Sequence, residues 1–237
     1  MQTEIEALCR NGQAQTHAQP LSVALKRTTA LSKDANLPDN HIMLTFDDGP
    51  KLPHTMILLD ILKRCGIKAH FFLVGRQATR HAHKTVIRQM VADGHVVGSH
   101  TQTHKYKLAH TNFPKAKEEV TRGHRSVENA LGFKTPFFRF PYGSVGPRPQ
   151  IFNLLHDWDL VHVFWNLRSR DTSVSKLGRL MSLSIESYKK HGKGIWVGHD
   201  RRESTVRLVV KLIPWLMKEG AVFSTIKIDG AARGSTP

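Results

Sequence analysis

Short strand-like runs alternate with helical segments along most of this chain, and this alternation limits the folds open to it. Apolar and β-branched residues mark about seven strands, at His41–Phe46, Ile67–Val74, His95–Ser99, Pro136–Phe140, Asp159–Trp165, Gly194–Val197 and Ala221–Ile226. Helical spacing predicts helices at Thr55–Cys65, Ala82–Asp93, Lys115–Leu131, Gln150–Asp157, Leu177–Lys190 and Thr205–Lys218. Strands joined through helices pair in parallel with right-handed crossovers. So many evenly spaced strands favour a closed or nearly closed α/β barrel over a small open sheet.

Residues 1–40 lack this alternation. They are polar with weak periodicity, so we expect an N-terminal extension followed by one domain over residues 41–237. The chain does not begin with the apolar core of a signal peptide, which leaves either a cytosolic protein or a mature exported form with Met1 added. Cys9 and Cys65 are compatible with one disulfide in an oxidising compartment or with two buried thiols in a reducing one.

The balance of charge is strongly positive. Among 237 residues, 35 Lys and Arg against 19 Asp and Glu give a formal net charge of +16. Such a charge indicates a polyanionic partner, which can be a nucleic acid or another anionic polymer. The Lys and Arg residues are spread along the chain and no nucleic-acid motif occurs, so we expect no nucleic-acid partner. No apolar run reaches about 18 residues, and we therefore expect no membrane span.

Ionisable side chains follow most of the predicted strands. In a barrel of parallel strands, the active site is built from the loops at the carboxyl ends of the strands. The residues found there are Asp47, Asp48, His100, His104, Arg139, Asp171, His199 and Asp200. Because a barrel brings its strand ends together, groups that lie far apart in the sequence are expected to converge on one site.

His100 and His104 have the i, i+4 spacing that puts two imidazoles on one side of a helical turn, as a metal ion requires. A surface pair is the alternative, because the chain has 15 histidines. Adjacent Asp47 and Asp48 repel each other, so one of them is best placed on a cation; a turn or a helix N-cap is the alternative. Two His and one Asp would leave coordination positions open, which is typical of a catalytic metal site.

Two further strand-end residues call for partners. Arg139 lies in the aromatic run FFRFPY, where an unpaired guanidinium would be costly to bury, so we expect it to pair with a carboxylate. His199 ends the apolar run IWVGH, where a hydrogen-bonded core histidine is the alternative to a catalytic one.

Five segments together resemble the motifs of the polysaccharide deacetylase family, the group with the NodB homology domain, also called carbohydrate esterase family 4. They are TFDDGP at Thr45–Pro50, H-[ST]-x-x-H at His100–His104, R-x-P-x at Arg139–Tyr142, a partial D-S-x-D-W at Arg168–Thr172, and L-x-H, with a conservative change, at Val197–His199. The stretch Ala69–Gly75 is also similar to the family's second strand, with His70 in place of the usual Thr. The resemblance covers roughly residues 41–226, and the segments follow the family's order.

The resemblance implies a distorted (β/α)7 barrel, which agrees with the strand pattern. It also implies a metal-dependent hydrolase, with Zn²⁺ as the expected metal, that removes N-acetyl groups from the N-acetylhexosamine residues of peptidoglycan and releases acetate. A chitin deacetylase and an O-acetyl xylan esterase are alternatives that share every catalytic residue. A non-catalytic basic protein that binds wall polymer or nucleic acid is an alternative of a different class, and an intact set of catalytic residues argues against it.

The same resemblance implies a role for each residue near the metal. Asp48, His100 and His104 hold the ion, which polarises the acetyl carbonyl and activates a water molecule. Asp47 is the general base, and Arg139 pairs with it so that its carboxylate stays charged and oriented.

On the leaving-group side, the resemblance makes His199 the general acid that protonates the departing amine, and Asp171 raises the pKa of His199. The backbone N–H of Tyr142 stabilises the oxyanion of the tetrahedral intermediate. Tyr142, Val197 and Pro141 are the expected substrate-binding residues, with Tyr142 and Val197 lining a small acetyl pocket.

The fourth segment departs from the family pattern. Thr172 stands where the family has Trp, which removes one wall of the sugar groove, and Arg168 and Arg170 make the rim more positive. Together with the net charge, this favours an anionic polysaccharide, so we expect peptidoglycan rather than neutral chitin or xylan. Since the wall lies outside the cytoplasm, we expect an exported protein, periplasmic or extracellular, whose signal peptide is absent from this sequence.

Overall fold

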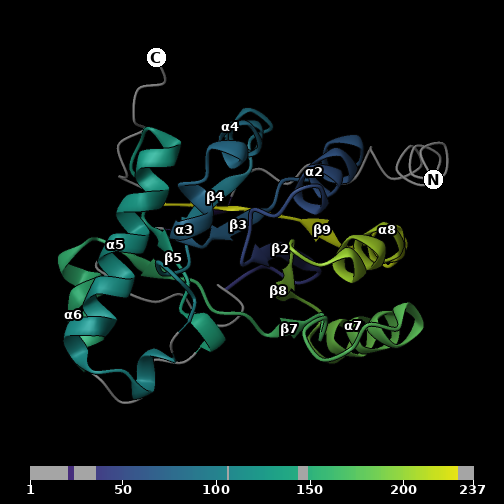
Figure 1. The fold of residues 1–237 in the computed structure, drawn as a ribbon. Coiled ribbons are helices and arrows are strands. Elements are labelled where there is room, and N and C mark those ends of the chain that lie inside the picture. The colour runs from purple at the N-terminus through teal and green to yellow at the C-terminus, as the bar shows by residue number, and fades with distance from the viewer. Residues whose placement is uncertain (1–20, 24–35, 106, 144–148, 229–237) are drawn as a thin grey trace.

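The computed structural model describes residues 21–23, 36–105, 107–143 and 149–228 (Figure 1). Most of the expected N-terminal extension lies outside the described residues, apart from the strand β1 (Leu21–Val23) and the segment 36–40 that leads into the sheet. The choice between a disulfide and two thiols for Cys9 and Cys65 also lies outside the described residues, because Cys9 is not among them.

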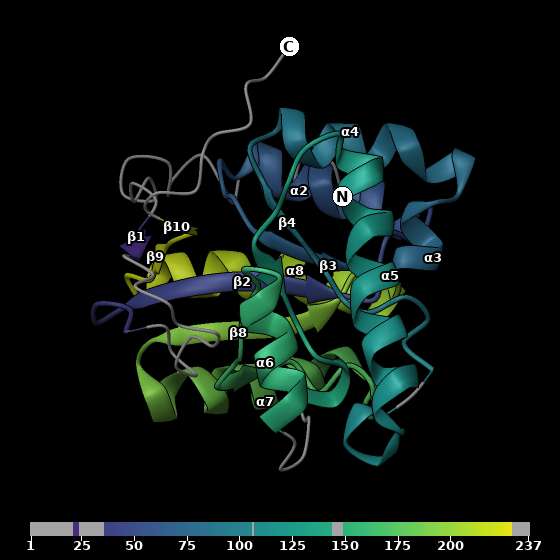
Figure 2. The ribbon, with the colours of Figure 1, turned by 90° about the vertical axis from the view of Figure 1, so that its left-hand side faces the viewer.

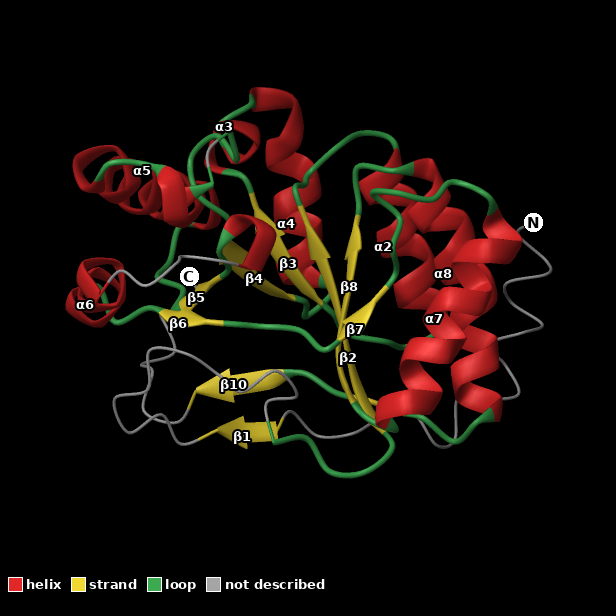
Figure 3. Ribbon diagram, turned by 90° about the horizontal axis from the view of Figure 1, so that it is seen from below, coloured by secondary structure: helices red, strands yellow, loops and turns green. Residues whose placement is uncertain are grey.

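A curled sheet of parallel strands forms the centre of the molecule (Figure 3). In spatial order, its strands are β6 (Val161–His162), β5 (Phe137–Phe138), β4 (Val96–Ser99), β3 (His70–Leu73), β2 (His41–Asp47), β8 (Gly194–His199) and β7 (Leu167–Arg168), and β9 (Val222–Phe223) also pairs with β2. Within the described residues, the edge strands β6 and β7 do not pair with each other, so the barrel stays open along that side. The expected α/β fold, a distorted (β/α)7 barrel, is confirmed in this curled form.

Helices pack side by side around the outside of the sheet (Figures 1 and 2). Each helix packs against the next in the order α7 (Leu177–His191), α8 (Glu203–Lys218), α2 (His54–Arg64), α4 (Lys84–Ala92), α5 (Phe113–Leu131) and α6 (Pro149–Asp157). Shorter helical turns lie in the connections, at α3 (Gly75–Ala78), η1 (His81–His83), η2 (Leu108–His110) and η3 (Pro141–Gly143). Among the described residues, no helix combines the length and the apolar character that crossing a membrane requires.

Strand β2 places its side chains alternately on the two faces of the sheet. Ile42, Leu44 and Phe46 belong to the large apolar core between the sheet and the helices. Met43 belongs to a second apolar cluster inside the curl of the sheet. Because side chains along a strand alternate with a period of two, Asp47 shares the inner face with Met43 and lies at the carboxyl end of the strand.

The prediction of one last strand over Ala221–Ile226 is wrong. The chain makes two short strands there, β9 (Val222–Phe223) beside β2 and β10 (Ile226–Ile228), which pairs with β1 in a separate two-stranded sheet. The backbone N–H of Ile226 donates a hydrogen bond to Nε2 of the buried His70 (3.1 Å). A side chain of β3 therefore holds the beginning of β10, which the apolar pattern alone does not reveal.

The predicted strand Asp159–Trp165 is also longer than the observed one, because only β6 (Val161–His162) pairs with the sheet on that side. The chain then crosses the open side of the barrel and rejoins the sheet as β7, which was not predicted. Just past β6, the backbone N–H of Val163 still donates to the carbonyl of Phe138 in β5 (2.9 Å), and the Val163 side chain packs in the second apolar cluster inside the curl.

Candidate active site

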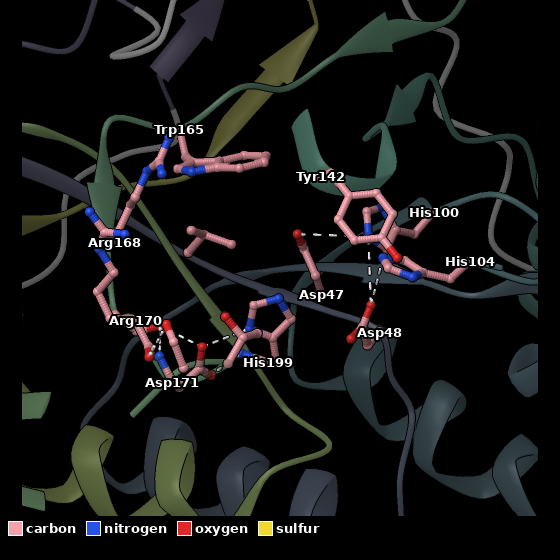
Figure 4. A pocket seen from close by; sticks show the side chains of 14 residues that line it. Asp47, Asp48, His100, His104, Tyr142, Trp165, Arg168, Arg170, Asp171 and His199 are labelled. Carbon is pink, nitrogen blue, oxygen red and sulfur yellow. Dashed lines mark hydrogen bonds and ion pairs between the residues drawn. The ribbon is translucent and has the colours of Figure 1, made fainter. Parts of the chain in front are cut away.

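A pocket of about 250 Å³ opens at the carboxyl ends of the strands (Figure 4). Its lining comes from distant parts of the sequence: Asp47, Asp48, His100, His104, Tyr142, Trp165, Arg168, Ser169, Arg170, Asp171, Thr172, Ser173, Val197 and His199. Most of the strand-end residues expected to converge therefore meet here. The sequence-predicted residues Arg139, Pro141 and Asp200 are buried and do not line the pocket.

Three of the lining residues form a set that fits a divalent metal ion. Oδ1 of Asp48 lies 3.3 Å from Nε2 of His104 and 3.7 Å from Nε2 of His100. Donor atoms bound about 2.1 Å from a tetrahedral zinc ion lie about 3.4 Å apart, so these spacings suit one shared ion. Oδ1 of Asp48 is buried and has no hydrogen-bond partner among the described residues, as expected of a ligand atom.

His100 is held in the form that binds a metal. Its Nδ1 donates a hydrogen bond to the carbonyl oxygen of Arg139 (2.7 Å), which leaves the lone pair on Nε2 facing Asp48. Burial, and then the nearby charge of His104, lower the pKa of His100 to about 3. The ring is therefore neutral at physiological pH, and a neutral imidazole is the form that ligates.

The loop that carries both histidines is fastened to α5. The carboxylate of Glu119 accepts hydrogen bonds from the backbone N–H and the hydroxyl of Thr103 (both 2.9 Å). The backbone N–H of Gln102 donates to the carbonyl of Glu119 (2.8 Å). A Cβ at Gly123 would overlap backbone atoms of Thr101 and Gln102, so only glycine lets the helix approach this closely. Neither Glu119 nor Gly123 carries a sequence signal of its own, since both act through a tertiary contact.

Asp47 is paired with the buried Arg139. One guanidinium nitrogen donates to Oδ1 of Asp47 (2.8 Å) and to the hydroxyl of Thr45 (2.6 Å), and Nε donates to the carbonyl of Val163 (2.8 Å). Burial lowers the pKa of Arg139, and the charge and hydrogen bond of Asp47 oppose that effect. Arg139 therefore has the carboxylate partner that its aromatic surroundings required, and it fixes one oxygen of Asp47. The other oxygen lies 3.9 Å from Nε2 of His100, on the side of the metal set.

His199 and Asp171 form the second pair. Nδ1 of His199 lies 2.8 Å from Oδ1 of Asp171, and the backbone N–H of His199 donates to Oδ2 (2.8 Å). Hydroxyls of Ser169 and Thr205 also donate to Asp171. Burial alone lowers the pKa of His199, but the hydrogen bond and charge of Asp171, with the charges of Asp47 and Asp48, raise it to about 9. The ring is therefore protonated at neutral pH and can donate a proton into the pocket.

Tyr142 and Val197 line the pocket, as a substrate-binding role requires, whereas Pro141 does not. The ring of Tyr142 is 55% exposed and its centroid lies 5.0 Å from that of His104. The backbone of Tyr142 has φ 61°, an unusual value for a residue with a Cβ.

Trp165 also lines the pocket and was missed as a site residue, although it ends a predicted strand and the strand-end rule could have found it. Its ring supplies an apolar wall, which matters because position 172 has lost the family's Trp.

Asp200 takes no part in the lining. It is fully buried, and its Oδ2 accepts a hydrogen bond from the hydroxyl of Thr55 (2.7 Å). Burial raises the pKa of Asp200 to about 7. Its carboxylate occupies the space into which a Cβ at Gly49 would point, so it supports the turn that carries Asp48.

Comparison with known proteins places this geometry in a family. The family model described as polysaccharide deacetylase matches residues 34–160. A peptidoglycan-N-acetylglucosamine deacetylase of Bacillus cereus is 31% identical over 215 residues, which cover 87% of this chain and 74% of that protein. Chitin deacetylase 2 of Saccharomyces cerevisiae is 31% identical over 174 residues, 71% of this chain and 53% of that protein. In fold, the chain is similar to a Bdellovibrio bacteriovorus peptidoglycan deacetylase, with TM-score 0.79, 23% identity, and coverage of 97% of this chain and 68% of that one.

Proposed function

Because this chain belongs to the polysaccharide deacetylase family, whose enzymes act on N-acetyl amide bonds, we propose that it is a zinc-dependent hydrolase that deacetylates N-acetylhexosamine residues of peptidoglycan and releases acetate. One observation carries the proposal. Asp48, His100 and His104, which can together hold a metal ion, share one pocket with Asp47, the carboxylate partner of Arg139, and with a protonated histidine, His199.

The donor set of two imidazoles and one carboxylate suits Zn²⁺ and leaves positions open for water and substrate. A divalent cation bound there supplies a Lewis acid that stabilises negative charge developing on the acetyl oxygen. Binding and removal of the ion are directly measurable.

The side chains of the protein divide the proton transfers between them. Asp47 accepts a proton from the water molecule that adds to the acetyl carbon, and Arg139 orients this carboxylate through its 2.8 Å hydrogen bond. When the bond between carbon and nitrogen breaks, His199 gives its proton to the nitrogen, which leaves as the sugar amine. Asp171 holds the resulting ring in place by the hydrogen bond at Nδ1. The immediate products are acetic acid, which ionises to acetate in solution, and the sugar amine. Asp47 has gained one proton and His199 has given one up, so atoms and charge balance.

The chemistry of the leaving group argues for an amide substrate. An amine is a poor leaving group until it is protonated, whereas an ester alkoxide depends less on an acid. The raised pKa of His199, about 9, provides a proton at neutral pH. This arrangement favours N-deacetylation over the O-acetyl esterase alternative.

Peptidoglycan is the proposed polymer, with chitin as the alternative that the yeast relative represents. Two properties support this choice: the Bacillus cereus relative carries the name of a peptidoglycan deacetylase, and the net charge of +16 attracts an anionic polymer. Action on a wall polymer also requires an exported protein, so we propose a periplasmic or extracellular location.

The test incubates zinc-loaded protein with peptidoglycan glycan strands, chitin oligomers and acetylated xylan, and measures acetate together with free amines by mass spectrometry. We expect equal amounts of acetate and amine from peptidoglycan, lost with a chelator and restored by Zn²⁺. Acetate without amine would indicate an esterase, and amine from chitin oligomers alone would indicate a chitin deacetylase. Polymer binding without acetate release would indicate a non-catalytic binder. Each of these results contradicts the proposal.

A further inference from the structure

Two arginines of the divergent fourth segment face the pocket. Arg168, the last residue of β7, is exposed, and so is Arg170. Ser169, which lies between them, and Asp171, which follows Arg170, are buried. Figure 4 shows both arginines on the side of Trp165, across the pocket from the metal-type histidines. Both arginines therefore line the pocket with exposed side chains.

The backbone under these two side chains is held firmly. The N–H of Ser169 donates to the carbonyl of Val197 in β8 (3.1 Å), and Arg168 itself is paired with Val197 in the sheet. The carbonyl of Arg170 accepts from the N–H of Ser173 (3.1 Å), which closes a turn. The backbone that carries the two guanidinium groups is therefore ordered by the sheet and by the turn. Binding a ligand there loses little further backbone entropy.

Neither guanidinium has an ion-pair partner in the described part of the chain. Two carboxylates of the same pocket are already engaged, because Asp47 pairs with Arg139 and Asp171 pairs with His199. A guanidinium offers a planar fork of N–H donors that matches a carboxylate. Among the described residues, no carboxylate is therefore paired with these two arginines, and a carboxylate of the substrate fits this place.

We propose that Arg168 and Arg170 form a subsite that binds a carboxylate of the substrate beside the acetyl pocket. This inference rests on the proposed function, because peptidoglycan carries carboxylates on lactyl groups and on stem peptides, whereas chitin carries none. Arg168 is the sheet neighbour of Val197, which lines the pocket two residues before His199. The bound carboxylate therefore belongs to the sugar that loses its acetyl group or to the adjoining unit.

The test compares matched glycans with the zinc-loaded protein. The first is a peptide-free tetrasaccharide of alternating N-acetylglucosamine and N-acetylmuramic acid with free lactyl carboxylates. The second is the same tetrasaccharide with these carboxylates reduced to alcohols, and chitotetraose is the third. Amine release gives kcat/KM for the wild type, Arg168→Gln, Arg170→Gln and the double variant. Arg207→Gln is the matched control, because Arg207 is an exposed arginine of α8 that does not line the pocket.

We expect the wild type to prefer the acid over the reduced glycan by about tenfold, since hydrogen bonds to a charged group are the stronger kind. Each single variant lowers this preference, and the double variant brings the ratio close to one. Arg207→Gln keeps the wild-type ratio. Arg168→Lys keeps the charge but loses part of the preference, because Lys lacks the planar fork.

Three results would overturn the subsite. The wild type could deacetylate the acid glycan, the reduced glycan and a glycan with stem peptides equally, which removes the subsite but leaves the proposed function standing. The double variant, shown by its melting temperature to be folded, could keep the wild-type preference. Amine from chitotetraose alone would remove the proposed function and the subsite with it.

A fourth substrate separates the two sources of carboxylate. In a tetrasaccharide with stem peptides, the lactyl carboxylates are tied up as amides and only the peptide carboxylates are free. If the arginine-dependent preference is greater with the peptide-free glycan, the subsite binds the lactyl group. If it is greater with the peptide-bearing glycan, the subsite binds the stem peptide.

Discussion

At the scale of single residues, the backbone at position 48 decides what two adjacent aspartates can do. In a continuing strand, Asp48 would point to the opposite face from Asp47. Its φ of 77° lies in the left-handed region, where the chain turns, and both carboxylates reach one pocket. Asp47 then meets Arg139 while Asp48 meets the two histidines. The sequence predicted both residues at the site, but the turn that brings them together depends on buried neighbours such as Asp200.

The pKa of His199 gives a prediction at this scale. After burial, the hydrogen bond with Asp171 and then the charge of Asp171 have the largest effects on the pKa of His199. Asp171→Asn removes the charge and leaves at most a neutral hydrogen bond, so this pKa falls from about 9. A general acid must be protonated to act, so activity is lost as the pH rises through this pKa. We expect the alkaline limb of the kcat profile to move to lower pH by at least about one unit.

The measurement is kcat for amine release between pH 6 and 10 in the zinc-loaded wild type and variant. Asp157→Asn serves as the matched control, because Asp157 is an exposed aspartate of α6 that does not line the pocket. An alkaline limb at the same pH in wild type and Asp171→Asn would show that His199 is not the acid.

At the scale of elements, the packing of α5 against the histidine loop controls the metal-type site. Gly123→Ala adds a methyl group where backbone atoms of Thr101 and Gln102 already lie, so the loop must move. Displaced ligands lose affinity, and we expect the dissociation constant for Zn²⁺ to rise at least about tenfold. Gly178→Ala in α7 is the matched control, because nothing lies within 4 Å of its added Cβ. The measurement is Zn²⁺ titration by calorimetry, and equal affinities in the two variants would contradict this account.

The contact between His70 and β10 gives a second prediction for an element. Burial, with the charges of Arg139 and His95, lowers the pKa of His70 to about 3, so the ring is neutral in the folded protein. The unfolded chain takes up a proton on this side chain below about pH 6.5. His70 therefore contributes stability that is present above that pH and is lost as the pH falls toward 3.

His70→Gln keeps an acceptor for the N–H of Ile226 but does not titrate. Between pH 7 and pH 5, we expect the wild type to lose about 2 kcal/mol more unfolding free energy than the variant. Urea unfolding at both pH values measures the difference. A difference between the two proteins that does not change with pH would mean that His70 is not a buried neutral ring.

The elements also show how far sequence patterns extend. The long amphipathic helices α5, α7 and α8 were predicted close to their observed bounds because their apolar spacing and terminal glycines are local signals. The short strands β7 and β10 were missed, since their pairing is set by β8 and β1 rather than by their own residues. Catalytic-type residues were found because they follow strands directly, whereas the bracing residues Glu119 and Gly123 act through contacts that no local pattern encodes.

At the scale of the whole molecule, the metal-type site joins parts of the chain that are far apart in sequence. Asp48 follows β2, and His100 and His104 follow β4. A ligand that binds only the folded state stabilises it, by about 4 kcal/mol at a thousandfold excess over its dissociation constant. For a domain of this size we expect the melting temperature to rise by about 10 °C with Zn²⁺. Scanning calorimetry with Zn²⁺ and with chelator tests this, and His104→Ala should not show the rise.

The most direct test of the whole account is acetate release by Asp47→Asn, with Zn²⁺ binding measured on the same sample. Asp47 is placed as the base and not as a ligand, so we expect the variant to bind Zn²⁺ like the wild type and to lose at least about a hundredfold in kcat on peptidoglycan glycan. Asp48→Asn, one residue away, should lose Zn²⁺ affinity and activity together. If Asp47→Asn keeps wild-type acetate release, or loses activity only because it no longer binds Zn²⁺, the division of the site into base and metal ligands is contradicted.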